Sequence, residues 1–265
     1  MTWQMQERTI EQLTITDEPS FAHVALYADL KEILRKDRYR FRVLPAAAAR
    51  WDRALLLNLT FWGVQGCGDV LVDDFLDADV VTHAAWHHLA ARALASDASA
   101  SQSAEALFFG EAIASAFDVY LVGRLLGHAQ SSSFLESQVP SMAETADAAG
   151  LSAADFDALL QQIAADPERA FEDLRALLFD VSVALLHCLD ARDALVVLEG
   201  FDTHRFAPLL HRFELSTWVL FARARAGDAT GPDARVRAVD RTLREQKVAL
   251  DWLTKAWVLP ALSAQ

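Results

Sequence analysis

Two short segments carry the residues whose types and spacing could support chemistry. They contain Asp79, His83 and His87 in the first, and Glu111, Ser115 and Asp118 in the second. If both segments are helical, each set shares one face, because residues three or four apart are neighbours on an α-helix. Two imidazoles one turn apart, facing a carboxylate from a neighbouring helix, suit a divalent metal that keeps a fourth position open.

The spacing predicts His83, His87 and Glu111 as the metal ligands. Zinc is the first choice, because imidazole and carboxylate groups are among its usual ligands. The remaining polar residues of the two segments are expected to lie behind the ligands and to orient the imidazoles through the far ring nitrogen. These are Asp79, Ser115 and Asp118. The competing interpretation is a pair of partly buried histidines that hydrogen-bond to neighbouring acids without a metal.

At these residues the chain resembles the gluzincin class of zinc metallopeptidases. That class has the pattern HExxH on one helix and a glutamate on the next, often preceded by glycine. Here residues 83–87 are His-Ala-Ala-Trp-His, and residues 110–111 are Gly-Glu. The resemblance implies that His83, His87 and Glu111 bind zinc. Ala84 stands where the class has its catalytic glutamate, so the usual proton acceptor for the metal-bound water is missing. The catalytic residues are therefore left unassigned.

A second acidic motif predicts a different chemistry. Residues 73–77 are Asp-Asp-Phe-Leu-Asp, which matches the DDxxD pattern of class I terpene and prenyl-diphosphate synthases. In such an enzyme Asp73, Asp74 and Asp77 would bind Mg²⁺, which in turn holds a diphosphate. The second metal-binding motif of that family has no match in this chain. A third hypothesis is a non-catalytic helical module that binds a protein partner.

A looser pair lies further along the chain. His211 and Glu214 are three residues apart and would be neighbours on a helix. Di-iron helical bundles use this spacing in the opposite order and in two copies, and only one pair is present here. We expect a hydrogen-bonded pair at the surface.

The elements that must position these residues are predicted to be helices. The chain has 265 residues and no alternation of β-branched and polar residues between hairpin turns, so we predict an all-α fold. A single domain over residues 1–265 with about eight helices is expected. The segment 46–62 is apolar around nearly its whole circumference, which predicts a central helix. Residues 128–150 are rich in serine and small residues and are predicted to form a long loop.

Composition narrows the possible partners. Lys and Arg number 24 against 37 Asp and Glu, giving a formal charge of −13, which argues against a general nucleic-acid binder. The two cysteines form no CxxC pair, so a thiolate metal site is not indicated. We found no signal peptide and no uninterrupted apolar run long enough to span a membrane, and we predict a cytoplasmic protein. An unknown small molecule or peptide is the expected ligand, and the oligomeric state is not predicted.

Overall fold

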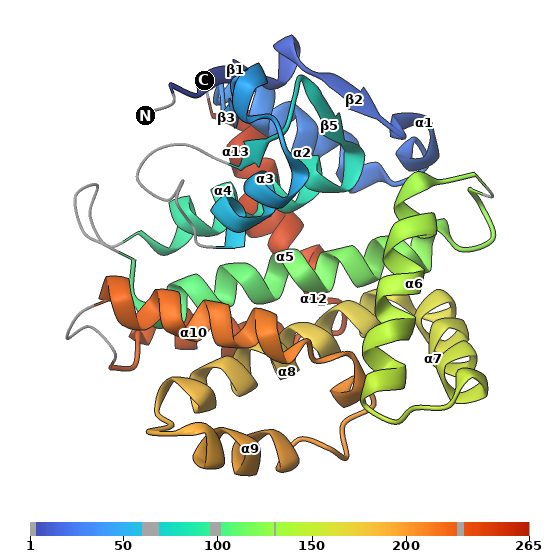
Figure 1. Ribbon diagram of the computed structural model, residues 1–265, viewed down its shortest axis with the longest axis vertical. Coiled ribbons are helices and arrows are strands. Elements are labelled where there is room, and N and C mark those ends of the chain that lie inside the picture. Colours follow the sequence, from blue (N-terminus) through green and yellow to red (C-terminus); the bar gives the residue numbers. More distant parts are fainter. Residues whose placement is uncertain (1–3, 60–68, 96–101, 130, 227–230, 265) are drawn as a thin grey trace.

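The molecule combines a helical body with two small sheets formed by its N-terminal part (Figure 1). The computed structural model describes residues 4–59, 69–95, 102–129, 131–226 and 231–264. Most of these residues are helical, so the prediction of a mainly helical fold is confirmed. A large cluster of buried apolar side chains runs from Ile10 to Ala261 and joins the N-terminal part to the helices that follow it.

The N-terminal part alternates short strands with short helices. Its elements are β1 (Gln6–Thr9), η1 (Ile10–Gln12), β2 (Thr14–Thr16), α1 (Glu18–Phe21), α2 (Ala25–Lys36), β3 (Arg40–Val43), η2 (Ala46–Ala48), α3 (Trp51–Leu59), β4 (Val70–Leu71) and β5 (Phe75–Asp77). Strand β3 pairs antiparallel with β1 and parallel with β4, and β2 pairs parallel with β5. The pair β2–β5 leads directly into the next helix, which carries the two histidines of the predicted site.

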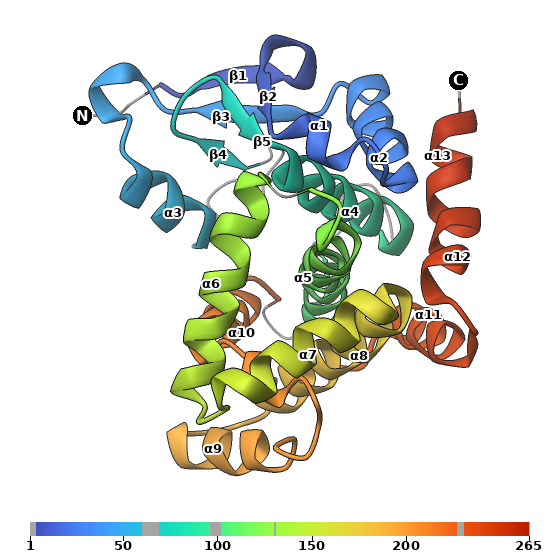
Figure 2. The same cartoon turned by 90° about the vertical axis from the view of Figure 1, so that its right-hand side faces the viewer.

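The rest of the described chain is helical. Its elements are α4 (Ala78–Leu94), α5 (Ala104–Leu125), α6 (Ser133–Ala148), α7 (Ala153–Ala165), α8 (Pro167–Leu186), α9 (Ala191–Glu199), η3 (Ala207–Leu209), α10 (Arg212–Ala226), α11 (Ala234–Glu245), α12 (Ala249–Leu253), η4 (Thr254–Val258) and α13 (Leu259–Ser263). Figure 2 shows α5 surrounded by other elements, with α4 on one side and α8 on the other.

Three details of the predicted fold are wrong. The fold is not purely α, because strands of two to four residues are too short to show an alternating pattern in the sequence. The described residues also form more than eight helices. Residues 128–150 are not a long loop, since most of them form α6. This helix begins at Ser133 and is capped by Ser132, whose hydroxyl accepts a hydrogen bond from the amide of Leu135. It tolerates Pro140 in its interior.

Helix α5 lies at the centre of the core. It packs against α4, α7, α8 and α10, and most of its side chains are buried. Small residues allow this close packing: a Cβ at Gly123 would lie 2.7 Å from the carbonyl oxygen of Ile163 on α7. By length and hydropathy alone α5 could cross a membrane, but 83% of its most apolar window is buried inside the protein. Core helices of soluble proteins pass the same test.

The helix expected to be central is instead peripheral. Within the predicted segment 46–62, the structure has η2 and then α3, and residues 60–62 lie outside the described part. The side chains of Trp51 and Leu55 on α3 are 73% and 48% exposed. An apolar circumference therefore did not distinguish a core helix from one that leaves an apolar face in water.

Candidate metal centre

The predicted metal ligands lie on two helices that pack against each other. Asp77 precedes the first turn of α4, and His83 and His87 follow one turn apart on one face of that helix. Ser103 caps the N-terminus of α5 by accepting a hydrogen bond from the amide of Ala106, and Glu111 lies two turns further on. Helices α4 and α5 pack against each other, which brings the three side chains to one place.

The three side chains converge on a common point. Each offers one ligand atom, and these atoms lie within 4.8 Å of one another. Nε2 of His87 is 3.1 Å from Nε2 of His83 and 3.5 Å from Oε2 of Glu111. Ligand atoms around a tetrahedral zinc ion lie about 3.3 Å apart, because each is about 2.0–2.1 Å from the metal. The two measured separations are therefore close to those of a zinc-bound set.

The far side of His83 is held by a second carboxylate from α5. Oδ2 of Asp118 accepts a hydrogen bond from Nδ1 of His83 at 3.0 Å. This contact leaves Nε2 of His83 directed toward His87 and Glu111, as in metal sites where a carboxylate orients a ligating histidine. The other oxygen of Asp118, Oδ1, is buried and has no hydrogen-bond partner within the described residues. The site therefore contains more acceptor capacity than its own donors use.

Asp79 and Ser115, the other two residues predicted to support the ligands, make no hydrogen bond to them among the described residues. Asp79 precedes His83 by one turn, and the charges of Asp118 and His83 act on its carboxyl group. Burial and the neighbouring carboxylates of Asp118 and Asp77 raise the pKa of Asp79 to about 7. Ser115 is half-buried on the face of α5 that carries Glu111, and its hydroxyl makes no hydrogen bond among the described residues. Its supporting role stays a prediction.

The charges of the site act strongly on His83 and Glu111. Burial lowers the pKa of His83, but the carboxylates of Asp118, Glu111 and Asp69 outweigh it and raise that pKa to about 10. Burial raises the pKa of Glu111, and the imidazoles of His87 and His83 more than compensate, so the net shift is downward. The acids thus stabilise positive charge on the imidazole of His83, and a bound cation would experience the same attraction.

Water reaches the ligands. The side chains of His83 and His87 are each 30% exposed, whereas that of Glu111 is 11% exposed. Behind them, Trp86 is fully buried and packs edge-on against Phe117, with the ring centroids 5.4 Å apart. The ligands therefore rest on a rigid apolar layer and present their open side to solvent, which an open coordination position requires.

Sequence reasoning missed two acids that act on this site. Glu214, in the first turn of α10, interacts electrostatically with Glu111, His83 and Asp118. Asp69, just before β4, acts on His83. The expected pairing of Glu214 with His211 occurs only through the backbone, since the amide of Glu214 donates to Nδ1 of His211. No local spacing relates these acids to α4 or α5, so no sequence pattern could have indicated them.

The DDxxD carboxylates lie on a turn and a strand rather than on a helix. Oδ1 of Asp74 accepts a hydrogen bond from Nε of Arg8 at 3.0 Å, and Asp73 accepts one from the amide of Phe75. Asp77 contacts the hydroxyl of Thr16. Each of the three carboxylates therefore has its own partner among the described residues.

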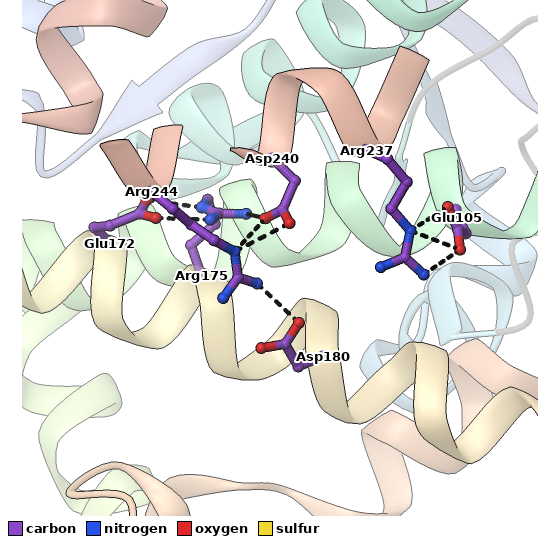
Figure 3. A network of polar contacts seen from close by, with 7 residues as sticks. All are labelled: Glu105, Glu172, Arg175, Asp180, Arg237, Asp240 and Arg244. Carbon is purple, nitrogen blue, oxygen red and sulfur yellow. Dashed lines mark hydrogen bonds and ion pairs between the residues drawn. The ribbon is translucent and has the colours of Figure 1, made fainter. Parts of the chain in front are cut away.

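A separate cluster of charged side chains links α8, α11 and α5, as Figure 3 shows. Arg175 is fully buried and donates two hydrogen bonds to Glu172 and one to Asp240. Arg244 donates to both oxygens of Asp240 and to Asp180. In the same view, Arg237 of α11 holds Glu105 of α5. We call these seven residues the arginine network.

Comparison of the chain with protein-family models, with curated proteins and with solved structures gave no match. Interpretation of the site therefore depends on its own geometry.

Proposed function

We propose that the protein binds a divalent cation, zinc as first choice, through His83, His87 and Glu111, and uses a metal-bound water for hydrolysis. The observation that carries this proposal is the convergence of the three ligand atoms within 4.8 Å, on a side of the helices that water reaches. A two-histidine, one-carboxylate set with an open fourth position is typical of catalytic zinc, which activates a bound water.

The surroundings of the ligands support the same function. Asp118 holds the far nitrogen of His83, and its buried Oδ1 has no donor within the described part of the chain. A cation nearby would offset the charge of this carboxylate and of Glu111. A small molecule or peptide is the proposed substrate class, because the open side of the site faces solvent. The overall acidity of the chain argues against a nucleic acid as the substrate. A cytoplasmic location stays part of the proposal.

Metal analysis of purified protein tests this function directly. We expect about one zinc per chain after reconstitution and dialysis, and none in the double variant His83→Ala/His87→Ala. His88→Ala is the matched control, because Nε2 of His88 lies 2.7 Å from Oδ2 of Asp37, away from the other two imidazoles. Absence of bound zinc in the wild type, or equal loss in the control, contradicts the proposal.

A non-catalytic partner-binding module is the second candidate. It is favoured by the exposed apolar side chains of Trp51 and Leu55, which lie one turn apart on α3. Large apolar groups that share an exposed face often mark interaction surfaces. A wild-type chain that binds no zinc would leave this candidate as the better account.

A further inference from the structure

A second pair of histidines lies away from the candidate metal centre, where two turns of the chain meet. His23 is in the turn between α1 and α2, and His128 is in the turn that follows α5. The centres of their imidazole rings are 5.1 Å apart, and the ring planes are inclined at 42°. No local spacing relates the two residues, so the folding of the chain brings them together.

Contacts other than the two rings hold these turns against each other. The carboxylate of Asp17, at the start of α1, accepts a hydrogen bond from the hydroxyl of Ser132 at 2.6 Å and one from the amide of Phe134 at 3.3 Å. The ring of Phe134 also packs against that of Phe21, with the ring centres 5.8 Å apart. Figure 1 shows α1 beside the beginning of α6. The two imidazoles therefore meet on a framework that other residues provide.

Gly127 determines how the chain turns after α5. Its φ is +81°, a left-handed conformation that costs glycine little, and the amides of His128 and Ala129 both donate to the carbonyl of Leu125. This turn ends α5 and leaves His128 exposed to solvent, as His23 is. Water and small ions therefore reach both rings.

The hydrogen bonds of the pair leave ring nitrogens free to bind a metal. Nε2 of His23 lies 2.9 Å from the carbonyl oxygen of Arg124, and because a carbonyl only accepts, this nitrogen carries the proton. Nδ1 of the neutral His23 ring then has a free lone pair. Histidines that bind metals commonly donate their other ring N–H to a backbone carbonyl in this way. His128 makes no side-chain hydrogen bond among the described residues, so either of its nitrogens can turn toward an ion.

The separation of the rings fits a shared ion. An imidazole nitrogen lies about 2.0–2.1 Å from a bound zinc ion, which puts the ring centre roughly 3.2 Å from the ion. Two such rings at a tetrahedral angle have their centres roughly 5 Å apart. The separation is 5.1 Å for His23 and His128, and it is 4.9 Å for His83 and His87 in the candidate centre. The second pair is therefore spaced as the first pair is.

The positive charge of Arg124 is balanced within this region. Its guanidinium donates a hydrogen bond to the hydroxyl of Tyr120 at 3.1 Å and forms an ion pair with Glu168. Because Glu168 offsets the charge of the guanidinium, repulsion of a cation bound beside the Arg124 carbonyl is reduced.

We propose that His23 and His128 bind one divalent transition-metal ion, through Nδ1 of His23 and one ring nitrogen of His128. Imidazole is a good ligand for copper, nickel and zinc, and Cu²⁺ binds most tightly in this series. The ion would link the turn before α2 to the end of α5, with water in its remaining positions. This site is separate from His83, His87 and Glu111, so the inference does not rest on the proposed function.

Binding of Cu²⁺ tests the site in a chain that lacks the candidate centre. In the double variant His83→Ala/His87→Ala we expect one bound Cu²⁺ per chain, whose electron paramagnetic resonance spectrum shows nitrogen splitting from two imidazoles. Adding His128→Phe should weaken this binding about tenfold or more, while phenylalanine preserves the ring contact with His23. His187→Ala is the matched control, because His187 is exposed at the end of α8 and has no imidazole neighbour among the described residues.

The same titration in the wild type does not depend on how the double variant folds. There, His128→Phe should remove one equivalent of bound Cu²⁺, and His187→Ala should remove none. The inference is overturned if His128→Phe leaves Cu²⁺ binding unchanged, if the nitrogen splitting comes from a single imidazole, or if His187→Ala weakens binding equally. Absence of zinc at His83 and His87 would remove the proposed function and leave this inference standing.

Discussion

The arginine network and the candidate metal centre are two clusters of charged residues in one core, and they differ in how their charges are balanced. In the network, three guanidinium groups face four carboxylates, Glu105, Glu172, Asp180 and Asp240, and each carboxylate has an arginine partner. In the candidate centre, two imidazoles face Glu111 and Asp118, with the charges of Asp69, Asp79 and Glu214 nearby. The second cluster therefore has an excess of acid.

The two clusters also differ in their access to water. Arg175 has no exposed surface, and its neighbours seal it between α8 and α11. His83 and His87 are partly exposed. A cluster in which every carboxylate has an arginine partner holds helices together, and removing the buried Arg175 is costly because its largely buried partners lose their counter-charge. A partly exposed cluster with surplus acceptors is suited to hold a cation that the chain itself does not supply.

The largest effect is expected from breaking the network. Arg175→Met should lower the free energy of unfolding by about 3–5 kcal/mol, because the carboxylates of Glu172 and Asp240 lose a buried guanidinium partner. Arg169→Met is the control on the same helix, since that side chain is 69% exposed and forms only an ion pair with Asp173. Its effect should stay below about 1 kcal/mol. Urea denaturation of both variants measures the difference, and equal effects would mean that the network is not a special structural unit.

A smaller effect, confined to metal binding, is expected in the candidate centre. Asp118→Asn should weaken zinc binding about 10- to 100-fold, because the amide holds Nδ1 of His83 less firmly and removes a negative charge. Asp157→Asn, on the exposed face of α7, should leave the zinc affinity unchanged. Competition with a chromophoric chelator gives the dissociation constants. If the Asp118→Asn variant binds zinc as tightly as the wild type, Asp118 does not contribute to zinc binding.

Competition between zinc and protons should change the dissociation constant for zinc about tenfold per pH unit. The carboxylates around His83 raise its pKa to about 10, so the imidazole carries a proton at neutral pH in the metal-free protein. Zinc must displace this proton, and the dissociation constant should therefore fall about tenfold for each unit of pH from about 6 to 9. Calorimetric titrations in buffers of different ionisation enthalpy measure the protons released. A zinc affinity that does not change with pH would show that zinc displaces no proton from His83.

The smallest effect is expected from a substitution in the acidic motif at residues 73–77, which suggested diphosphate chemistry. Asp74 forms an exposed ion pair with Arg8, so Asp74→Asn should change the free energy of unfolding by less than about 1 kcal/mol. Zinc affinity should not change. Titration with Mg²⁺ and inorganic diphosphate provides the decisive comparison, because magnesium-dependent binding that Asp74→Asn abolishes would favour the terpene-synthase-like alternative over the zinc site.

Sequence reasoning could place the ligands on one face of each helix but could not choose the helix at the core. The segment 46–62 and the segment of α5 are both apolar around their circumference, yet α3 exposes Trp51 while α5 is buried. Hydrophobicity records how much surface an element could bury, whereas the partners that cover it come from distant parts of the chain. The prediction of a loop at 128–150 was also wrong. Pro140 and several serines are typical of loops, but here they belong to a helix with a serine cap.

The local sequence by itself determined that His83 and His87 share a face of α4, because an α-helix of 3.6 residues per turn leaves no other arrangement for that spacing. Only the tertiary structure decided that Glu111 meets His87 and that Asp118 meets His83. These relations depend on how separate helices pack. That packing minimises exposed apolar surface over the whole chain and is not recorded in any short motif.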